Sequence, residues 1–240
     1  MNLFENLEEL TGNTVTEASL HDAIVLLNGK RRVLQRLAGF RKRDAVPISG
    51  KDVLLITQIA FYDDPARFTS MVGKLCDELD ARARSSVSVF PKGAKRILLT
   101  GTPLGRGSEK VLRLLEDAGA VVVALENCTG LKGVSGFVDE TGDPLAALAR
   151  RYLATPCSCM SPNAGRFALL DALAAQFRPT GMVDLVWQAC HTYSVESHDV
   201  GDHVERTLGL PFLKIETDYT ESDMEQLRTR IEAFLELQTL

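Results

Sequence analysis

The five cysteines are the residues of this sequence that offer the most chemistry, and four of them fall in predicted loops or at the end of a predicted strand. Cys128 and Cys190 each follow an apolar segment typical of a strand, and Cys157 and Cys159 share a loop between them. Thiolates from scattered loops are the usual ligands of iron–sulfur clusters. The absence of a CxxC pair disfavours a zinc ribbon or a thioredoxin-type motif. Cys76, on the apolar face of a predicted helix, is expected to be a core residue.

A second interpretation of Cys190 is a nucleophile served by a neighbouring base. His191 and Glu196 follow it closely in the chain, and a cysteine paired with histidine is a known nucleophilic arrangement. Adjacent side chains usually point in different directions, so this spacing favours a hydrolase less than a metal site. An inert thiol is the third interpretation.

A glycine-rich turn, GTPLGRG, contains Gly101, Gly105 and Gly107 and precedes a predicted helix. Backbone N–H groups at such a helix start can bind a phosphate or another anion. The turn is not a Walker motif, because Arg106 stands where the second glycine is needed and the following lysine is missing. A tight turn without a ligand is the alternative, and a flavodoxin-like nucleotide-binding module is a further hypothesis.

An acidic cluster near the C-terminus could bind a cation or cap a helix. Ser222 is followed three residues later by Glu225, which is the pattern of a capping box and favours the capping role. The acidic residues concerned are Glu216, Asp218, Glu221 and Asp223.

The elements that position these residues alternate between strands and helices from residue 94 onward. Continuous apolar strands separated by helices predict a flavodoxin-like or Rossmann-like parallel sheet covered on both faces. The carboxyl ends of such strands form one edge, where ligands bind, so the thiols and the glycine turn should gather there. The expected strands are 96–101, 121–126, 182–190 and 211–217, and the expected helices are 108–118, 144–153, 164–177, 195–208 and 223–238.

The first part of the chain predicts a helical lead. Residues 1–43 read as helical, with Thr16 as a cap, and the stretch DAVPISGKD (44–52) is a clear break. The predicted division is a helical lead over 1–46 and an α/β domain over 47–240. Residues 53–62 are apolar without periodicity, so a fifth strand and a buried helix are both open, and a helix over 65–83 should follow Asp64.

Composition limits the classes of protein to consider. The 240 residues are 45% hydrophobic and 25% charged, an ordinary globular composition. The net charge of −5 provides no bulk basic surface for nucleic acid. No apolar run is long enough to span a membrane, and the acidic N-terminus MNLFENLEEL is not a secretory signal. We therefore expect a cytoplasmic protein with reduced thiols.

Four segments in order resemble the 2-hydroxyacyl-CoA dehydratase D-component family, which includes benzoyl-CoA reductase subunits and double-cubane-cluster proteins. They are RILLTGTPLGRGSEKVLRLLEDAGAVVVALENCTG, YLATPCSCMSPN, VDLVWQACHTYSVES and PFLKIETDYTESDMEQLRTRIEAFLE. The resemblance covers essentially the whole chain. Family members are longer, so the sequence resembles their C-terminal part, without the family's N-terminal domain.

The resemblance implies an iron–sulfur subunit, with a [4Fe–4S] or a double-cubane cluster. In such enzymes an ATP-dependent iron–sulfur activator delivers one electron, and a ketyl radical of a 2-hydroxyacyl-CoA loses water. The implied partners are the activator, an acyl-CoA substrate, and a homologous second subunit or a second copy of the chain. An aromatic-ring reductase, a double-cubane reductase and a scaffold subunit without a cluster are the alternatives.

Carried over by motif, Cys190 is the first expected cluster ligand, although the sequence reads CHTY where many members have CDPY. Cys128 in ENCTG is the second. Cys157 and Cys159 match a family motif and are expected to shape their loop. Gly101, Gly105 and Gly107 are expected to line a channel for CoA or substrate.

Overall fold

Four parallel strands form the sheet of this protein, described over residues 3–238 in a computed structural model. They lie in the order β2-β1-β3-β4, and all three neighbouring pairs are parallel. All four carboxyl ends therefore lie at one edge, which confirms the predicted α/β class. The strands are β1 (Arg96–Gly101), β2 (Val121–Glu126), β3 (Gly181–Trp187) and β4 (Phe212–Thr217).

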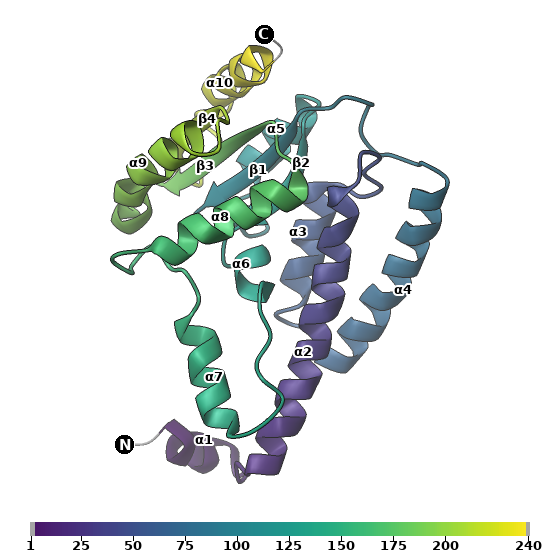
Figure 1. Ribbon diagram of the computed structural model, residues 1–240, viewed down its shortest axis with the longest axis vertical. Helices are drawn as coiled ribbons and strands as arrows, with labels where there is room; N and C mark the ends of the chain where they lie inside the picture. The colour runs from purple at the N-terminus through teal and green to yellow at the C-terminus, as the bar shows by residue number, and fades with distance from the viewer. Residues whose placement is uncertain (1–2, 239–240) are drawn as a thin grey trace.

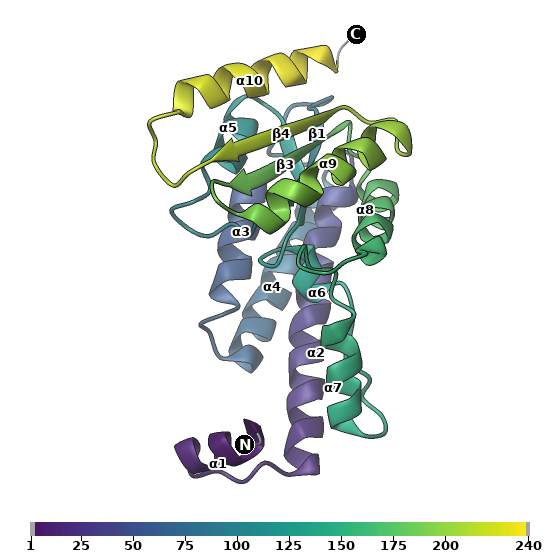
Figure 2. The same ribbon diagram turned by 90° about the vertical axis from the view of Figure 1, so that its left-hand side faces the viewer.

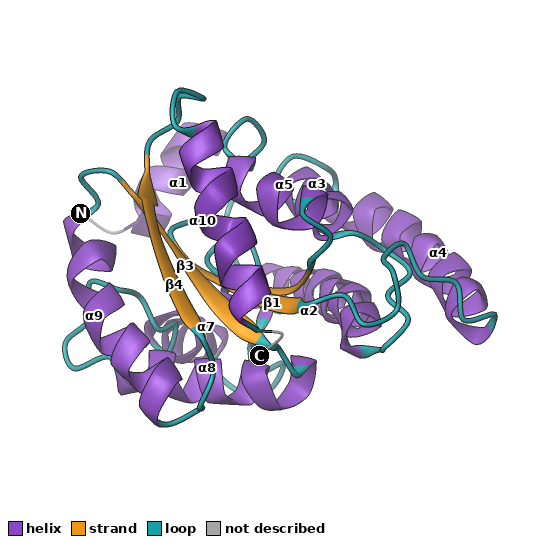
Figure 3. Cartoon of the chain, turned by 90° about the horizontal axis from the view of Figure 1, so that it is seen from above, coloured by secondary structure: helices purple, strands orange, loops and turns teal. Residues whose placement is uncertain are grey.

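Helices cover both faces of the sheet, as its uninterrupted apolar strands require. Every residue of β2 and β3 is buried. One face packs against α3 (Gly50–Ile59), α5 (Lys110–Asp117) and α10 (Met224–Leu237). The other face packs against α8 (Ala164–Phe177) and α9 (His191–Arg206). Figure 3 shows α9 and α10 on opposite sides of the strands.

The remaining helices form an arm that extends away from the sheet (Figures 1 and 2). Its axis is α2 (Glu17–Gly39), which shares a hydrophobic core with α3 and α4 (Pro65–Arg84). At the far end, α2 packs against α7 (Pro144–Leu153) through the small core that contains Ile24 and Ala147. The short helices are α1 (Leu3–Thr11), α6 (Leu131–Val134) and a 3-10 turn over Phe40–Lys42. The division of the chain after residue 46 stays a prediction.

Two expectations about the first part of the chain need correction. The helical lead is interrupted between α1 and α2, and Thr16 caps α2 through a reciprocal pair of bonds with Ser19. The strand alternative for residues 53–62 is wrong, because Gly50–Ile59 is α3. Ser49 accepts a hydrogen bond from the backbone N–H of Asp52, so a polar cap starts a helix here. Helix α4 begins after Asp64, as predicted.

Three helix starts differ from the predicted ones. Helix α5 begins two residues late, because the Ser108 hydroxyl bonds to Gly105 within the turn instead of capping the helix. Helix α9 begins earlier, at His191, immediately after Cys190. The capping box at Ser222 is also wrong, since Asp223 is the residue before α10. None of the described helices is long and apolar enough to cross a membrane.

Candidate active site

Three thiol-bearing loops lie at or beside the carboxyl edge of the sheet. Cys128 is exposed in the loop after β2, and Cys190 is half-buried between β3 and α9. Cys157 and Cys159 lie in the loop that joins α7 to α8. Cys76 is fully buried in the core of the helical arm, as expected.

Hydrogen bonds connect the loop of Cys157 to the start of α9. The Ser158 hydroxyl donates to Thr192 Oγ1 over 3.2 Å, and Thr192 Oγ1 lies 4.0 Å from the Cys190 sulfur. Burial raises the pKa of Tyr193, and the nearby thiols of Cys128 and Cys157 raise it further. The hydroxyl of Tyr193 therefore lies near the loops after β2 and α7.

Beneath these loops lies a buried network of charged side chains that the sequence did not indicate. Arg166 on α8 and Lys132 on α6 are completely buried, and so are Glu126 at the end of β2 and Asp184 on β3. Charged side chains are rarely buried unless they are paired. Glu196 on α9 completes the group and is 11% exposed.

Arg166 is the centre of this network. Its guanidinium pairs with Glu196, lies 3.5 Å from Glu126 and 3.8 Å from Asp184, and donates to Thr100 Oγ1 over 3.0 Å. Burial alone would lower the pKa of Arg166, but the three carboxylates outweigh it and raise the pKa. Arg166 therefore stays charged and joins α8 to β1, β2, β3 and α9.

The second cation of the network, Lys132, lies on α6, directly after the loop that carries Cys128. Lys132 Nζ lies 2.9 Å from Glu126 Oε1 and donates to the Tyr193 hydroxyl over 3.4 Å. Tyr193 also lies beneath both cations, with the Arg166 guanidinium 5.0 Å from its ring centre. The network thus fixes α6, α8 and α9, the helices that follow the three thiol-bearing loops.

Asp184 is the least satisfied member of the network. Burial raises the pKa of this carboxyl, and the nearby Ser197 hydroxyl and the positive charge of Arg166 only partly counter it. Neither carboxylate oxygen accepts a hydrogen bond of ordinary geometry from the described residues. Two cations therefore face three carboxyl groups, and a proton on Asp184 would leave the group neutral.

The hydrogen bonds of Glu196 do not support Cys190 as a nucleophile that Glu196 activates as a base. The Glu196 carboxylate bonds to Arg166 and Asn163, so it belongs to the buried network. The backbone N–H of His191 donates to the carbonyl oxygen of Ala189, and this bond belongs to the turn that starts α9.

The glycine turn is held by acceptors from the chain itself. The N–H of Gly105 donates to Ser108, that of Arg106 to Gln58, and that of Gly107 to Glu109. An anion would have to replace these bonds. Gly101 has a packing role, since a Cβ there would lie 2.1 Å from the carbonyl oxygen of Leu185. Substrate binding by Gly101, Gly105 and Gly107 stays a prediction.

The acidic cluster near the C-terminus is neutralised by neighbouring cations. Lys110 Nζ lies 2.6 Å from Asp223 and 3.8 Å from Asp218. Arg113 pairs with Glu221 over 3.1 Å, and Lys214 lies 3.9 Å from Glu216. These pairs account for the cluster without a bound cation, and those of Lys110 and Arg113 tie the loop before α10 to α5.

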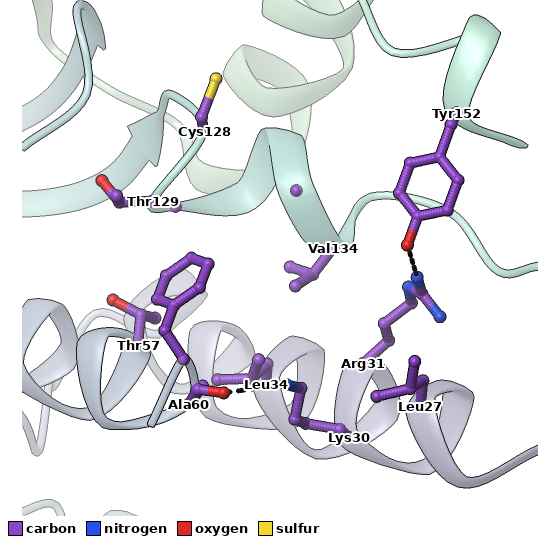
Figure 4. A pocket seen from close by; sticks show the side chains of 13 residues that line it. Leu27, Lys30, Arg31, Leu34, Thr57, Ala60, Cys128, Thr129, Val134 and Tyr152 are labelled. Carbon is purple, nitrogen blue, oxygen red and sulfur yellow. Dashed lines mark hydrogen bonds between the residues drawn. The ribbon is translucent and has the colours of Figure 1, made fainter. Parts of the chain in front are cut away.

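A cavity of about 290 Å³ lies between α2, the end of α3 and the loop after β2 (Figure 4). Most of its lining is apolar, and Lys30 and Arg31 line it from α2. Both cations have partners, because Lys30 donates to the carbonyl oxygen of Ala60 and Arg31 to the Tyr152 hydroxyl. Figure 4 shows the Cys128 thiol at the rim, pointing away from the cavity.

The thiols fit a shared metal site in part. Cys128 and Cys190 are accessible, unpaired thiols on loops at one sheet edge, which suits cluster ligands. Within residues 3–238, however, no three His, Cys, Asp or Glu side chains stand close enough together to hold a metal ion. The described residues therefore supply candidate ligands without a complete set.

The chain is similar to proteins of a known family. Residues 1–237 match the model of the family described as 2-hydroxyglutaryl-CoA dehydratase, D-component. The chain is 40% identical over 242 residues to the Escherichia coli (strain K12) protein named "Putative dehydratase subunit YjiM", covering 99% of this chain and 62% of that protein.

Two relatives with more specific names are more distant. The (R)-phenyllactyl-CoA dehydratase beta subunit of Clostridium sporogenes is 26% identical, over 97% of this chain and 60% of that protein. A benzoyl-CoA reductase subunit of Thauera aromatica is 25% identical, over 69% of this chain and 40% of that protein. The chain spans about three-fifths of the length of the first two relatives.

Proposed function

Because this chain belongs to the 2-hydroxyglutaryl-CoA dehydratase D-component family, we propose that it acts as an iron–sulfur subunit of a 2-hydroxyacyl-CoA dehydratase-like enzyme. The proposed reaction is the elimination of water from a 2-hydroxyacyl-CoA by a radical route, after one-electron activation by an ATP-dependent activator protein. The observation that supports this proposal is the placement of the thiol-bearing loops along one edge of the sheet, beside a buried charge network.

Cys190 and Cys128 would hold the cluster in this proposal. A bound cluster would supply low-potential electrons and a Lewis-acidic iron. The remaining work belongs to the protein, which positions the thioester and excludes water. The buried charge network helps to position the thioester, because it fixes the helices that follow the thiol-bearing loops through Arg166, Lys132 and Glu126.

The cavity beside Cys128 is the better candidate for the acyl group of the substrate. Its volume of about 290 Å³ approaches the range of small-molecule pockets, and its lining is mostly apolar. The glycine turn offers less, since its own side chains occupy the N–H groups of Gly105 and Gly107. We therefore place the acyl group between α2 and α6, while substrate binding by the glycine turn stays a prediction.

The family also contains enzymes with another outcome. The likeness to a benzoyl-CoA reductase subunit supports an aromatic-ring reductase as the second candidate function. A double-cubane reductase would use the same thiols.

The partners follow from the proposed reaction. The relatives are named as subunits, so we propose a homologous second subunit or a second copy of this chain as the first partner. The activator protein would be the second, and the acyl-CoA the small-molecule ligand. A cytoplasmic location is proposed with them, because the thiols need a reducing compartment.

The proposal is tested by turnover under anaerobic conditions. The chain is combined with its partner subunit, the activator, ATP and a low-potential reductant, and a panel of 2-hydroxyacyl-CoA thioesters is supplied. We expect the matching enoyl-CoA by mass spectrometry and its loss in Cys190→Ser, with Cys76→Ala as the matched thiol control. Ring reduction of an aromatic thioester in place of dehydration would favour the second candidate. Unchanged turnover in Cys190→Ser would contradict the assigned role of that thiol.

A further inference from the structure

Cys157 and Cys159 form a thiol pair whose sulfur atoms are in contact. The Cys159 Sγ donates to the Cys157 Sγ over 3.3 Å. The backbone N–H of Met160 donates to the carbonyl oxygen of Cys157 over 3.0 Å, which closes a turn around Ser158 and Cys159. Such a turn shortens the distance between the two cysteines compared with an extended chain.

The turn is held in place by the neighbouring helices. Asn163 donates its side-chain N–H to the carbonyl oxygen of Cys157 over 2.9 Å and also bonds to Glu196 on α9. The Ser158 hydroxyl between the two thiols donates to Thr192. The pair is therefore organised by α8 and α9 before any partner arrives.

The two thiols differ in their electrostatic surroundings. Hydrogen bonds from the Cys159 backbone and side chain lower the pKa of Cys157, and the charge of Lys132 contributes in the same direction. The same contact raises the pKa of Cys159, whose side chain is exposed. One member is thus favoured as a thiolate and the other as a neutral thiol, which is the division of roles in a dithiol exchange site.

We propose that Cys157 and Cys159 form a redox-active dithiol that exchanges with low-molecular-weight disulfides of the glutathione class. The Cys157 thiolate attacks one sulfur of the disulfide, forms a mixed disulfide and releases the first thiolate. The Cys159 sulfur, after losing its proton, then attacks Cys157, forms the Cys157–Cys159 bond and releases the second thiolate. Starting from the Cys157 thiolate and the Cys159 thiol, the protein loses two electrons and one proton, and the small disulfide gains both electrons and the proton and leaves as one thiolate and one thiol.

This site is separate from the proposed cluster ligands, although it lies beside them. The proposal needs neither a cluster nor an acyl-CoA, so its test is independent of the dehydratase proposal. Formation of the bond would change the loop that contacts Thr192, next to Cys190. Oxidation of the pair by cellular disulfides would therefore alter the structure of the sheet edge next to Cys190.

The test uses the full 240-residue chain, without iron, equilibrated anaerobically in mixtures of reduced and oxidised glutathione. After acid quenching, intact mass and peptide mapping are measured for the wild type, Cys157→Ser, Cys159→Ser and, as a matched control, Cys128→Ser. We expect the wild type and the control to lose two hydrogens through a Cys157–Cys159 bond. Cys159→Ser should instead accumulate a glutathione adduct on Cys157.

Two outcomes would overturn the proposal. Both thiols could remain free across the whole series while the chain stays folded by circular dichroism. Alternatively, the disulfide could join Cys157 or Cys159 to another cysteine, which would show that their mutual contact does not direct the reaction.

Discussion

Replacing Arg166 by methionine removes the cation that joins the buried network while it keeps much of the side-chain volume. The change leaves Glu126 and Asp184 buried without the guanidinium, and Glu196 without its cationic partner. Removing one partner of a buried ion pair costs about 3–5 kcal/mol. Because a typical domain is stable by only about 5–15 kcal/mol, the loss should be obvious.

The assay is denaturant unfolding followed by circular dichroism, with Arg32→Met as the matched control. Arg32 lies 2.5 Å from Glu140, but its side chain is 53% exposed. An exposed pair of this kind contributes about 0–1 kcal/mol. We therefore expect the free energy of unfolding to fall several times more in Arg166→Met than in Arg32→Met.

The dependence on pH gives a second, independent check. Without Arg166, the pKa of Asp184 in the folded protein should rise further above its unfolded value. The positive charge that partly offsets the effect of burial is then gone. A raised carboxyl pKa means that the folded state gains stability as the pH falls. The gap between Arg166→Met and wild type should narrow from about pH 7 to about pH 5. A loss no larger than that of Arg32→Met, or a gap that widens as the pH falls, would refute the reasoning.

Three further predictions concern single positions. Gly101→Ala should cost several kcal/mol in the free energy of unfolding, roughly 3 or more, because its Cβ would meet the carbonyl oxygen of Leu185 at 2.1 Å. Gly107→Ala, also at positive φ but with nothing within 4 Å, should cost only about 1–2 kcal/mol, and equal melting temperatures for the two variants would contradict this contrast. Burial raises the pKa of Cys76 to about 11, so iodoacetamide should leave it unmodified in the folded chain at neutral pH, and rapid labelling there would disprove its burial. Glu116→Ala should lower the free energy of unfolding by about 1–2 kcal/mol, because the carboxylate accepts the backbone N–H groups that start α3; a change below the error of denaturant titration would show that these bonds contribute nothing.

The sheet was predictable from the sequence because its strands carry their signal locally. Uninterrupted apolar runs such as VVVALE are buried on both faces, and the edge that collects the thiols follows from parallel pairing. Residues 53–62 carry no such signal. The polar start Ser49-Gly50-Lys51-Asp52 was the available evidence for a helix, because it resembles a capping box.

The charge network could not be predicted from the sequence for a different reason. Lys132, Arg166 and Glu196 each resemble an ordinary surface charge in the sequence, and only Glu126 and Asp184 stand out, because they lie in strands that are expected to be buried. Only the three-dimensional fold shows that they are buried together. The contact between the sulfur atoms of Cys157 and Cys159 was not predicted, because the two residues were expected only to shape their loop.

The central claim, that thiols at the sheet edge hold an iron–sulfur cluster, is tested most directly by metal analysis. Iron and acid-labile sulfide are quantified after anaerobic reconstitution of the wild type, Cys190→Ser, Cys128→Ser and the Cys76→Ala control, each alone and assembled with the partner subunit. The account predicts matching iron and sulfide in the wild type and the control, with marked loss in Cys190→Ser and Cys128→Ser. Iron content that is the same in all four proteins, or absent from the wild type when it is assembled with its partner subunit, would contradict it.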